Sequence, residues 1–394
     1  MGYTGLVETR PTETVRPREQ LSFTEQFNQR TKHLMTDGVF VGKKGVIVES
    51  VDIIPQEQKG KAVAYNLGYT AEITPCRPFF EGFYNKDRRV IGIDYPTHRP
   101  EIRGDELPEG FSAYAYRDAL AFTKVLMDKG IKEIDLVGQS SGGPKALIEN
   151  ILLTEMLTEA GIKVGSVVII NTFGFSDTTA RETLSRLKQV GDHEKALAKE
   201  NPDLAELQKE GGRALLSLIR RHPINTLLEG LDLKHVDMTT LLARTLGHGR
   251  RVAIVQPADD PFVPYAELGA GVALAQQRVR QEFVENLRDG TPDMMTNPAA
   301  RKDFDTQVAV FAEQEQQNPL IIPIPKEEKA GHLFSGFYPE NPNLYVPLAV
   351  DALNYFEFGE LSNAGLRGHY DALPIPSLYQ RVIKRISKLM PRGR

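Results

Sequence analysis

The sequence predicts an α/β fold, with a mostly parallel sheet that helices cover on both faces. Short apolar runs alternate with longer helical patterns between residues 62 and 170. Each strand–helix–strand unit is long enough for a crossover between parallel neighbours. The alternation stops at 176–245 and again at 265–317, and a strand pattern returns each time. We therefore expect one parallel core that two helical insertions interrupt.

The elements are expected in a definite order along the chain. A hairpin joins strands at 39–41 and 46–54 through a turn that begins and ends with glycine. The helix at 111–130 has Ala115, Phe122 and Leu126 on one face and ends at its last glycine. Further strands are expected at 62–67, 89–94, 134–137, 164–170, 251–256 and 320–324, and further helices at 77–86, 144–160 and 343–356.

Composition excludes several classes of protein. The chain has 394 residues, 41% of them hydrophobic and 25% charged, which is typical of a soluble globular protein. A net charge of −4 gives no reason to expect a nucleic-acid partner. Cys76 is the single cysteine, so an internal disulfide is impossible. With no apolar core of a signal peptide in residues 1–37 and no apolar run of 18 residues, the expected location is cytoplasmic.

The chain divides into five parts by composition. Residues 1–37 are polar and contain few aliphatic side chains, so they predict an N-terminal arm that drapes over the domain or is disordered. The α/β core is expected to comprise residues 38–171 and 250–360. The remaining three parts are a helical insertion at 172–249, a second one within the core at 265–318, and a basic tail at 375–394.

The residues that indicate chemistry lie between the strand at 134–137 and the helix that follows it. Ser140 has Gly138 two positions before it and Gly142 two positions after it, in a strand–turn–helix setting. A serine on such a sharp turn is strained, and larger side chains at the two glycines would collide with the neighbouring strand and helix. The alternative, that Ser140 only caps the helix, leaves the glycines unexplained.

A serine hydroxyl becomes a good nucleophile only when a base removes its proton and an acid orients that base. Asp260 follows the strand at 251–256, and Asp259 is the alternative acid. Two histidines lie downstream of Asp260. His332 follows the next strand, where a loop can bring it over the sheet edge, whereas His369 lies beyond the final helix and is the poorer candidate. A role for His332 as an ordinary loop histidine stays open.

With these motifs the chain resembles an α/β-hydrolase-fold serine hydrolase of the esterase or lipase kind. The likeness covers about residues 39–358, apart from the insertions. Its motifs are the G-x-S-x-G turn at 138–142, a D-x-x-V-P sequence that begins at Asp260 and a G-H pair that ends at His332. The resemblance implies that Ser140 is the nucleophile, Asp260 the acid and His332 the base.

An oxyanion hole requires two backbone N–H groups that point to the developing negative charge. One is expected from Ser141, at the N-terminus of the helix after the nucleophile. The other is expected from Tyr69, in the loop after the strand at 62–67. Many relatives carry His-Gly at that loop, whereas this chain has Leu67 followed by Gly68.

The first insertion resembles the helical cap that shapes the substrate pocket in this fold. Its apolar side chains are expected either to line that pocket or to form a small core of the cap: Leu215, Leu216, Leu218, Ile219, Leu227 and Leu228. In the tail, residues 378–390 have an apolar and a basic face, which favours docking on the domain itself, a membrane surface or a partner protein.

These patterns predict an enzyme that hydrolyses a carboxylic ester or related acyl bond through an acyl-enzyme intermediate. The expected substrate is a small acyl compound, and neither a cofactor nor a metal is implied, because the histidines of the first insertion have no ligand spacing. The alternatives are a non-catalytic binding or scaffold protein on the same fold, or an acyltransferase, peptidase or C–C hydrolase on the same three residues.

Overall fold

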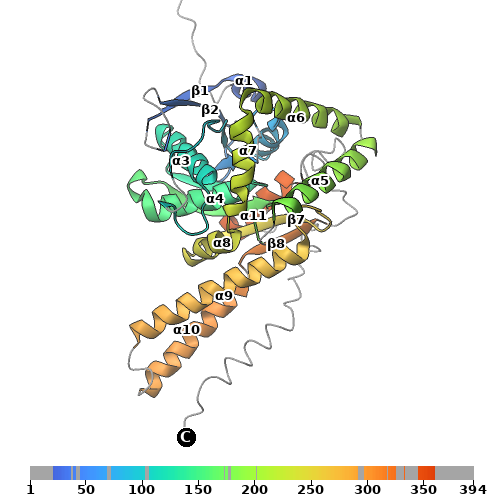
Figure 1. The fold of residues 1–394 in the computed structure, drawn as a ribbon. Coiled ribbons are helices and arrows are strands. Elements are labelled where there is room, and N and C mark those ends of the chain that lie inside the picture. Colours follow the sequence, from blue (N-terminus) through green and yellow to red (C-terminus); the bar gives the residue numbers. More distant parts are fainter. Residues whose placement is uncertain are drawn as a thin grey trace, which may run out of the picture.

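An eight-stranded sheet forms the centre of the molecule in the computed structural model (Figure 1). The structure describes residues 21–36, 39–40, 45–68, 72–102, 106–172, 174–175, 179–200, 202–291, 297–316, 318–324, 332 and 345–359. The strands follow the order β1-β2-β4-β3-β5-β6-β7-β8. β2 is antiparallel to β1 and β4, and every other neighbouring pair is parallel. The bounds are Thr31–Met35 for β1, Val46–Ile53 for β2, Ala62–Asn66 for β3, Val90–Ile93 for β4, Glu133–Gln139 for β5, Lys163–Ile170 for β6, Arg251–Pro257 for β7 and Leu320–Ile324 for β8.

Helices cover both faces of this sheet, as predicted. One face packs against α3 (Ala113–Asp128), α4 (Gly142–Ile151), α8 (Met238–Gly247) and α9 (Tyr265–Gly290). The other packs against α1 (Phe23–Asn28), α2 (Arg77–Asn85) and α11 (Tyr345–Phe358). Because successive strand residues point to opposite faces, Val167 and Ile169 of β6 lie in the first cluster, and Val168 and Ile170 lie in the second.

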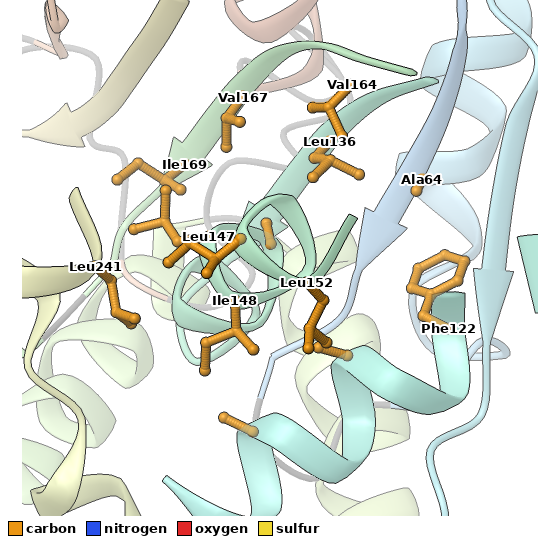
Figure 2. Close-up of a cluster of buried hydrophobic side chains, with 14 of the residues drawn as sticks. Ala64, Phe122, Leu136, Leu147, Ile148, Leu152, Val164, Val167, Ile169 and Leu241 are labelled. Atoms are coloured by element: carbon orange, nitrogen blue, oxygen red, sulfur yellow. The ribbon is translucent and has the colours of Figure 1, made fainter. Parts of the chain in front are cut away.

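The first cluster fixes the helix that follows the serine turn. Leu147 and Ile148 of α4 belong to one buried cluster with Leu136 of β5, Ile169 of β6 and Phe122 of α3 (Figure 2). The predicted helix at 144–160 is confirmed in its first half. From residue 152 it continues as a π-helical turn, Leu152–Met156, and a 3-10 turn, Thr158–Ala160.

The N-terminal arm needs a correction from residue 21 onward. A capping box at Ser22 begins α1, which packs against the second face of the sheet, and β1 follows it at the sheet edge. The first hairpin therefore joins β1 to β2, with Met35 opposite Val46, and residues 39–40 belong to its turn rather than to a strand. The polar composition concealed this helix, because Phe23 and Phe27 are the only apolar side chains that α1 buries. Residues 1–20 lie outside the described part of the chain.

The first insertion is helical but shorter than predicted. It contains α5 (Ala180–Glu200), α6 (Pro202–Arg221), α7 (Pro223–Asp232) and a 3-10 turn at Leu233–His235. α8, which the sequence placed in the insertion, packs against α4 and α9 and belongs to the core.

The second insertion forms a helical pair of α9 and α10 (Pro298–Gln316) that extends away from the body (Figure 1). Only its far part is an insertion, because α9 contributes Leu268, Val272, Ala275 and Val279 to the core. None of the helices in the described ranges is both long and apolar enough to cross a membrane. The tail at 375–394, with its amphipathic pattern at 378–390, lies outside the described residues.

Candidate active site

Ser140 lies on the turn between β5 and α4 with a left-handed backbone, at a φ of 52°. The backbone is held there because Ser140 N–H donates to the Ile170 carbonyl at 2.8 Å, and the Ser140 carbonyl accepts from Gly143 N–H at 3.0 Å. A left-handed conformation at a residue other than glycine costs free energy and persists only when its surroundings enforce it.

The flanking glycines are required by close backbone approach. A Cβ added to Gly138 would lie 2.1 Å from the carbonyl oxygen of Gly142, and one added to Gly142 would lie 2.1 Å from the carbonyl oxygen of Asn66. Both distances are far below van der Waals contact. The turn therefore has room for glycine alone at these two positions, for the steric reason that the sequence indicated.

One hydrogen-bond chain joins the three side chains that the sequence singled out. Ser140 Oγ lies 3.0 Å from His332 Nε2, and His332 Nδ1 lies 2.7 Å from Asp260 Oδ2. Because an ionised carboxylate only accepts, Nδ1 carries the proton that bonds to Asp260, and Nε2 is left to accept the serine hydroxyl. His332 and Asp260 are buried, and Ser140 is partly exposed.

Asp260 is stabilised as a carboxylate despite its burial. Burial alone would raise its pKa, but the charge and hydrogen bond of His332, together with the N–H groups of Phe262 and Val263, lower the pKa below its usual value. The Phe262 N–H donates to Oδ1 at 2.8 Å, and the Gln256 side-chain amide donates to Oδ2 at 3.0 Å. Asp260 is thus available as a fixed negative charge beside the imidazole.

His332 is held by contacts that the sequence reasoning missed. Asn171, just after β6, donates from Nδ2 to the His332 carbonyl at 3.1 Å, and it has a left-handed φ of 49°. The Phe262 ring lies 4.9 Å from the imidazole, centroid to centroid. An asparagine directly after a buried strand was a usable signal for Asn171, whereas Gln256 lies within β7 and carried none.

The two expected oxyanion donors are only partly within the described residues. Ser141 is buried and lies at the N-terminus of α4, where its N–H belongs to the first, unpaired turn. A Cβ added to Gly68 would lie 3.5 Å from Ser140 Cβ, so Gly68 itself lies beside the serine. Tyr69 lies outside the described residues.

The sequence left two alternatives open, Asp259 as the acid and His369 as the base. Asp259 makes no hydrogen bond to His332 among the described contacts, and its Oδ1 is buried without a partner. His369 lies outside the described residues. Within the described ranges no group of three or more His, Cys, Asp or Glu side chains is arranged to hold a metal ion.

A second serine–histidine–aspartate chain lies at the far edge of the sheet. His33 of β1 has Nε2 at 2.9 Å from Ser50 Oγ and Nδ1 at 3.1 Å from Asp128 Oδ2. Ser50 lies within β2 and is completely buried. This chain connects β1, β2 and α3, and no substrate can reach its serine.

The sheet order and the serine turn together decide the fold. Five consecutive parallel pairs run from β4 to β8, the antiparallel β1 and β2 lie at one edge, and the strained serine follows β5 in the centre. The chain has the α/β-hydrolase fold. No family model and no curated protein sequence matches it.

Solved structures of the α/β-hydrolase fold resemble this chain at low sequence identity. A thermophilic esterase from Thermogutta terrifontis is 13% identical over 83% of this chain and 99% of its own, with a TM-score of 0.48. The 2-hydroxy-6-oxo-6-phenylhexa-2,4-dienoate hydrolase of a Rhodococcus strain is 13% identical over 83% and 99%, with a TM-score of 0.49. A bacterial membrane phospholipase A is 14% identical over 85% and 89%, with a TM-score of 0.48.

Proposed function

We propose that this α/β-hydrolase-fold protein is a serine hydrolase that cleaves a carboxylic ester, with Ser140 as nucleophile, His332 as general base and acid, and Asp260 as the orienting acid. The observation that carries the proposal is the hydrogen-bond chain from Ser140 Oγ through His332 to Asp260, at 3.0 and 2.7 Å, on a serine with a strained backbone. Each group has the hydrogen-bond reach that its role requires.

The first half of the reaction forms an acyl-enzyme. Ser140 Oγ attacks the ester carbonyl carbon while His332 Nε2 takes the hydroxyl proton, and the carbonyl electron pair moves onto oxygen. The resulting oxyanion accepts from Ser141 N–H and from an N–H of the loop after Gly68, for which Tyr69 is the candidate. When the electron pair returns, the bond to the alcohol oxygen breaks and His332 gives its proton to the leaving alcohol.

The second half releases the acid. Water attacks the acyl carbon, His332 Nε2 takes a proton from it, and collapse of the second oxyanion breaks the bond to Ser140 Oγ, which regains a proton. Asp260 stays ionised throughout and stabilises the imidazolium. No cofactor takes part in these steps.

The experiment is covalent labelling with a fluorophosphonate probe, which reacts with activated serines. We expect the wild-type chain to be labelled, Ser140→Ala to lose all labelling, and Ser50→Ala to keep it. Ser50→Ala is the matched control, because it removes the serine hydroxyl of the other serine–histidine–aspartate chain, at the sheet edge. Labelling that persists in folded Ser140→Ala, or that is absent from folded wild type, contradicts the proposal.

A further inference from the structure

Helix α7 of the first insertion has three large apolar side chains on its outer side. Ile224, Leu227 and Leu231 share one face by their spacing of three and four residues, and they are 71%, 63% and 45% exposed. Of these three, only Leu227 was expected from the sequence to line a pocket or to form a core of the first insertion. For Leu227 this expectation is wrong, as it is for Leu216 and Ile219 of α6, which are also exposed.

The inner side of α7 is polar instead. Asn225 donates from Nδ2 to the Thr97 carbonyl at 2.7 Å, and Asp232 Oδ2 accepts from Tyr114 N–H at 2.9 Å. Glu229, between them along the helix, interacts with the charges of Lys145 and Asp118. A surface helix normally has the reverse arrangement, with its apolar side facing the core.

This inner side borders a large cleft. The cleft has a volume of about 1270 Å³ and lies between α7 and the segment 98–102 and 107–114, with Leu228 and Leu231 among its lining residues. Leu231 therefore belongs both to the cleft wall and to the exposed apolar stripe. An apolar surface that covers the stripe would be continuous with the cleft entrance.

The neighbouring end of α6 adds positive charge to the apolar side chains. Leu216 and Ile219 are exposed there, and Arg213 and Arg220 make no ion pair with any described residue. Between residues 211 and 228 the chain contains no acidic residue. Apolar side chains flanked by exposed arginines match the chemistry of an anionic lipid surface, where acyl chains lie beneath phosphate groups.

We propose that α7 and the end of α6, residues 213–231, dock onto an anionic lipid surface. The contact would cover the exposed stripe of Ile224, Leu227 and Leu231 and place Arg213 and Arg220 near lipid phosphates. Lipid fits better than a protein partner, because the chain between residues 211 and 228 carries basic and no acidic side chains, and the stripe continues into the cleft. Glu229, the one acid of the segment, interacts with charges on the inner side of α7. This inference does not depend on the proposed hydrolase activity.

The test is binding of the full chain to vesicles, measured by co-sedimentation. Vesicles of phosphatidylcholine with phosphatidylglycerol provide the anionic surface, and pure phosphatidylcholine is the comparison. The variant Ile224→Gln/Leu227→Gln/Leu231→Gln removes the stripe while keeping good helix formers at exposed positions. Ile47→Gln, at a β2 side chain that is 61% exposed, is the matched control for losing an exposed apolar residue.

We expect the wild type to bind anionic vesicles at least tenfold more tightly than pure phosphatidylcholine. The triple variant should lose at least tenfold in affinity at an unchanged melting temperature, and Ile47→Gln should bind like the wild type. Arg213→Gln/Arg220→Gln should bind more weakly and with a smaller dependence on salt. The inference is overturned if the wild type does not bind, if the triple variant binds equally well, or if the wild type is a dimer that the triple variant dissociates.

Discussion

Two serine–histidine–aspartate chains with nearly the same hydrogen-bond lengths lie at different places on one sheet. The distances are 3.0 and 2.7 Å for Ser140, His332 and Asp260, and 2.9 and 3.1 Å for the chain from Ser50 through His33 to Asp128. Ser140 is partly exposed on a strained turn before a helix, whereas Ser50 is buried within a strand.

The two acids differ as much as the two serines. Asp260 is buried, and none of its described contacts is with a lysine or an arginine. Asp128 is at the surface and shares its carboxylate with Lys124 at 2.5 Å. Residue types and the presence of both hydrogen bonds therefore do not distinguish the serine that we propose to be reactive from the buried one. Access, backbone strain and the helix N-terminus do.

The largest effect is expected from replacing the two histidines separately. His332→Gln removes the proposed general base, so kcat/KM for an ester should fall by at least about 10³-fold. His33→Gln should leave kcat/KM within about twofold of the wild type, because Ser50 is out of reach of substrate. Steady-state hydrolysis of 4-nitrophenyl acetate measures both. Equal losses of kcat/KM in the two variants would contradict the separate roles of the Ser140 chain and the Ser50 chain.

Gly142→Ala sharpens the steric part of the comparison. The new methyl group would overlap the Asn66 carbonyl, so we expect a loss of about 2–4 kcal/mol in the free energy of unfolding and a loss of activity. Gly191→Ala is the control, since a Cβ there meets no atom within 4 Å and the position is helical. That control should be neutral or stabilising by about 0.5–1 kcal/mol. Urea denaturation compares the two.

Glu149 of α4, the helix that follows the serine turn, gives the fold a pH dependence of its own. It is completely buried under the turn and accepts from Asn66 Nδ2 at 2.9 Å, and burial raises its pKa to about 8. Between its unfolded pKa of about 4.5 and about 8, the folded chain holds a proton that the unfolded chain releases. The free energy of unfolding should therefore fall as pH rises through this range and level off above it.

Glu149→Gln should remove that part of the decline while it keeps an acceptor for Asn66. Between pH 5 and pH 9 the free energy of unfolding should fall by about 4 kcal/mol more in the wild type than in the variant, measured by urea denaturation at each pH. Parallel pH profiles for the two proteins would show that Glu149 does not stay protonated in the fold.

The smallest effect is expected at the edge chain. Ser50→Ala leaves His33 Nε2 without its partner in a buried site, so the free energy of unfolding should fall by about 1–2 kcal/mol with no change in activity. A larger loss in activity than in stability would mean that the edge chain has more than a structural role. Denaturation and ester hydrolysis on the same preparation separate the two.

The fold and the central residues were predictable because their signals are local. The serine motif lies within five residues, from Gly138 to Gly142. Strands β3 to β8 are short apolar runs with polar or turn-forming residues at their ends. β1 was missed because its strand is only five residues long and alternates exposed with buried side chains after a polar segment. The place of α8 in the core and the outward face of α7 depend on packing between distant segments, which no local pattern encodes.

The contacts that hold His332 were not predictable either, because they also join segments that are distant in the sequence. Asn171 and His332 are 161 residues apart, and they meet because parallel β6 and β8 end at the same edge of the sheet. The choice of Asp260 over Asp259 likewise rests on which of two neighbouring side chains turns inward, and the backbone of residues 257–262 sets that direction.

The central claim, that Ser140 alone of the two serines forms an acyl-enzyme, is tested most directly by trapping that intermediate. The chain is mixed with 4-nitrophenyl acetate, quenched in acid and mapped by peptide mass spectrometry. We predict one acetyl group, on the peptide that contains Ser140, and none on the peptide that contains Ser50. Release of 4-nitrophenol with no acetyl group on Ser140, or an acetyl group at another serine, would contradict the account.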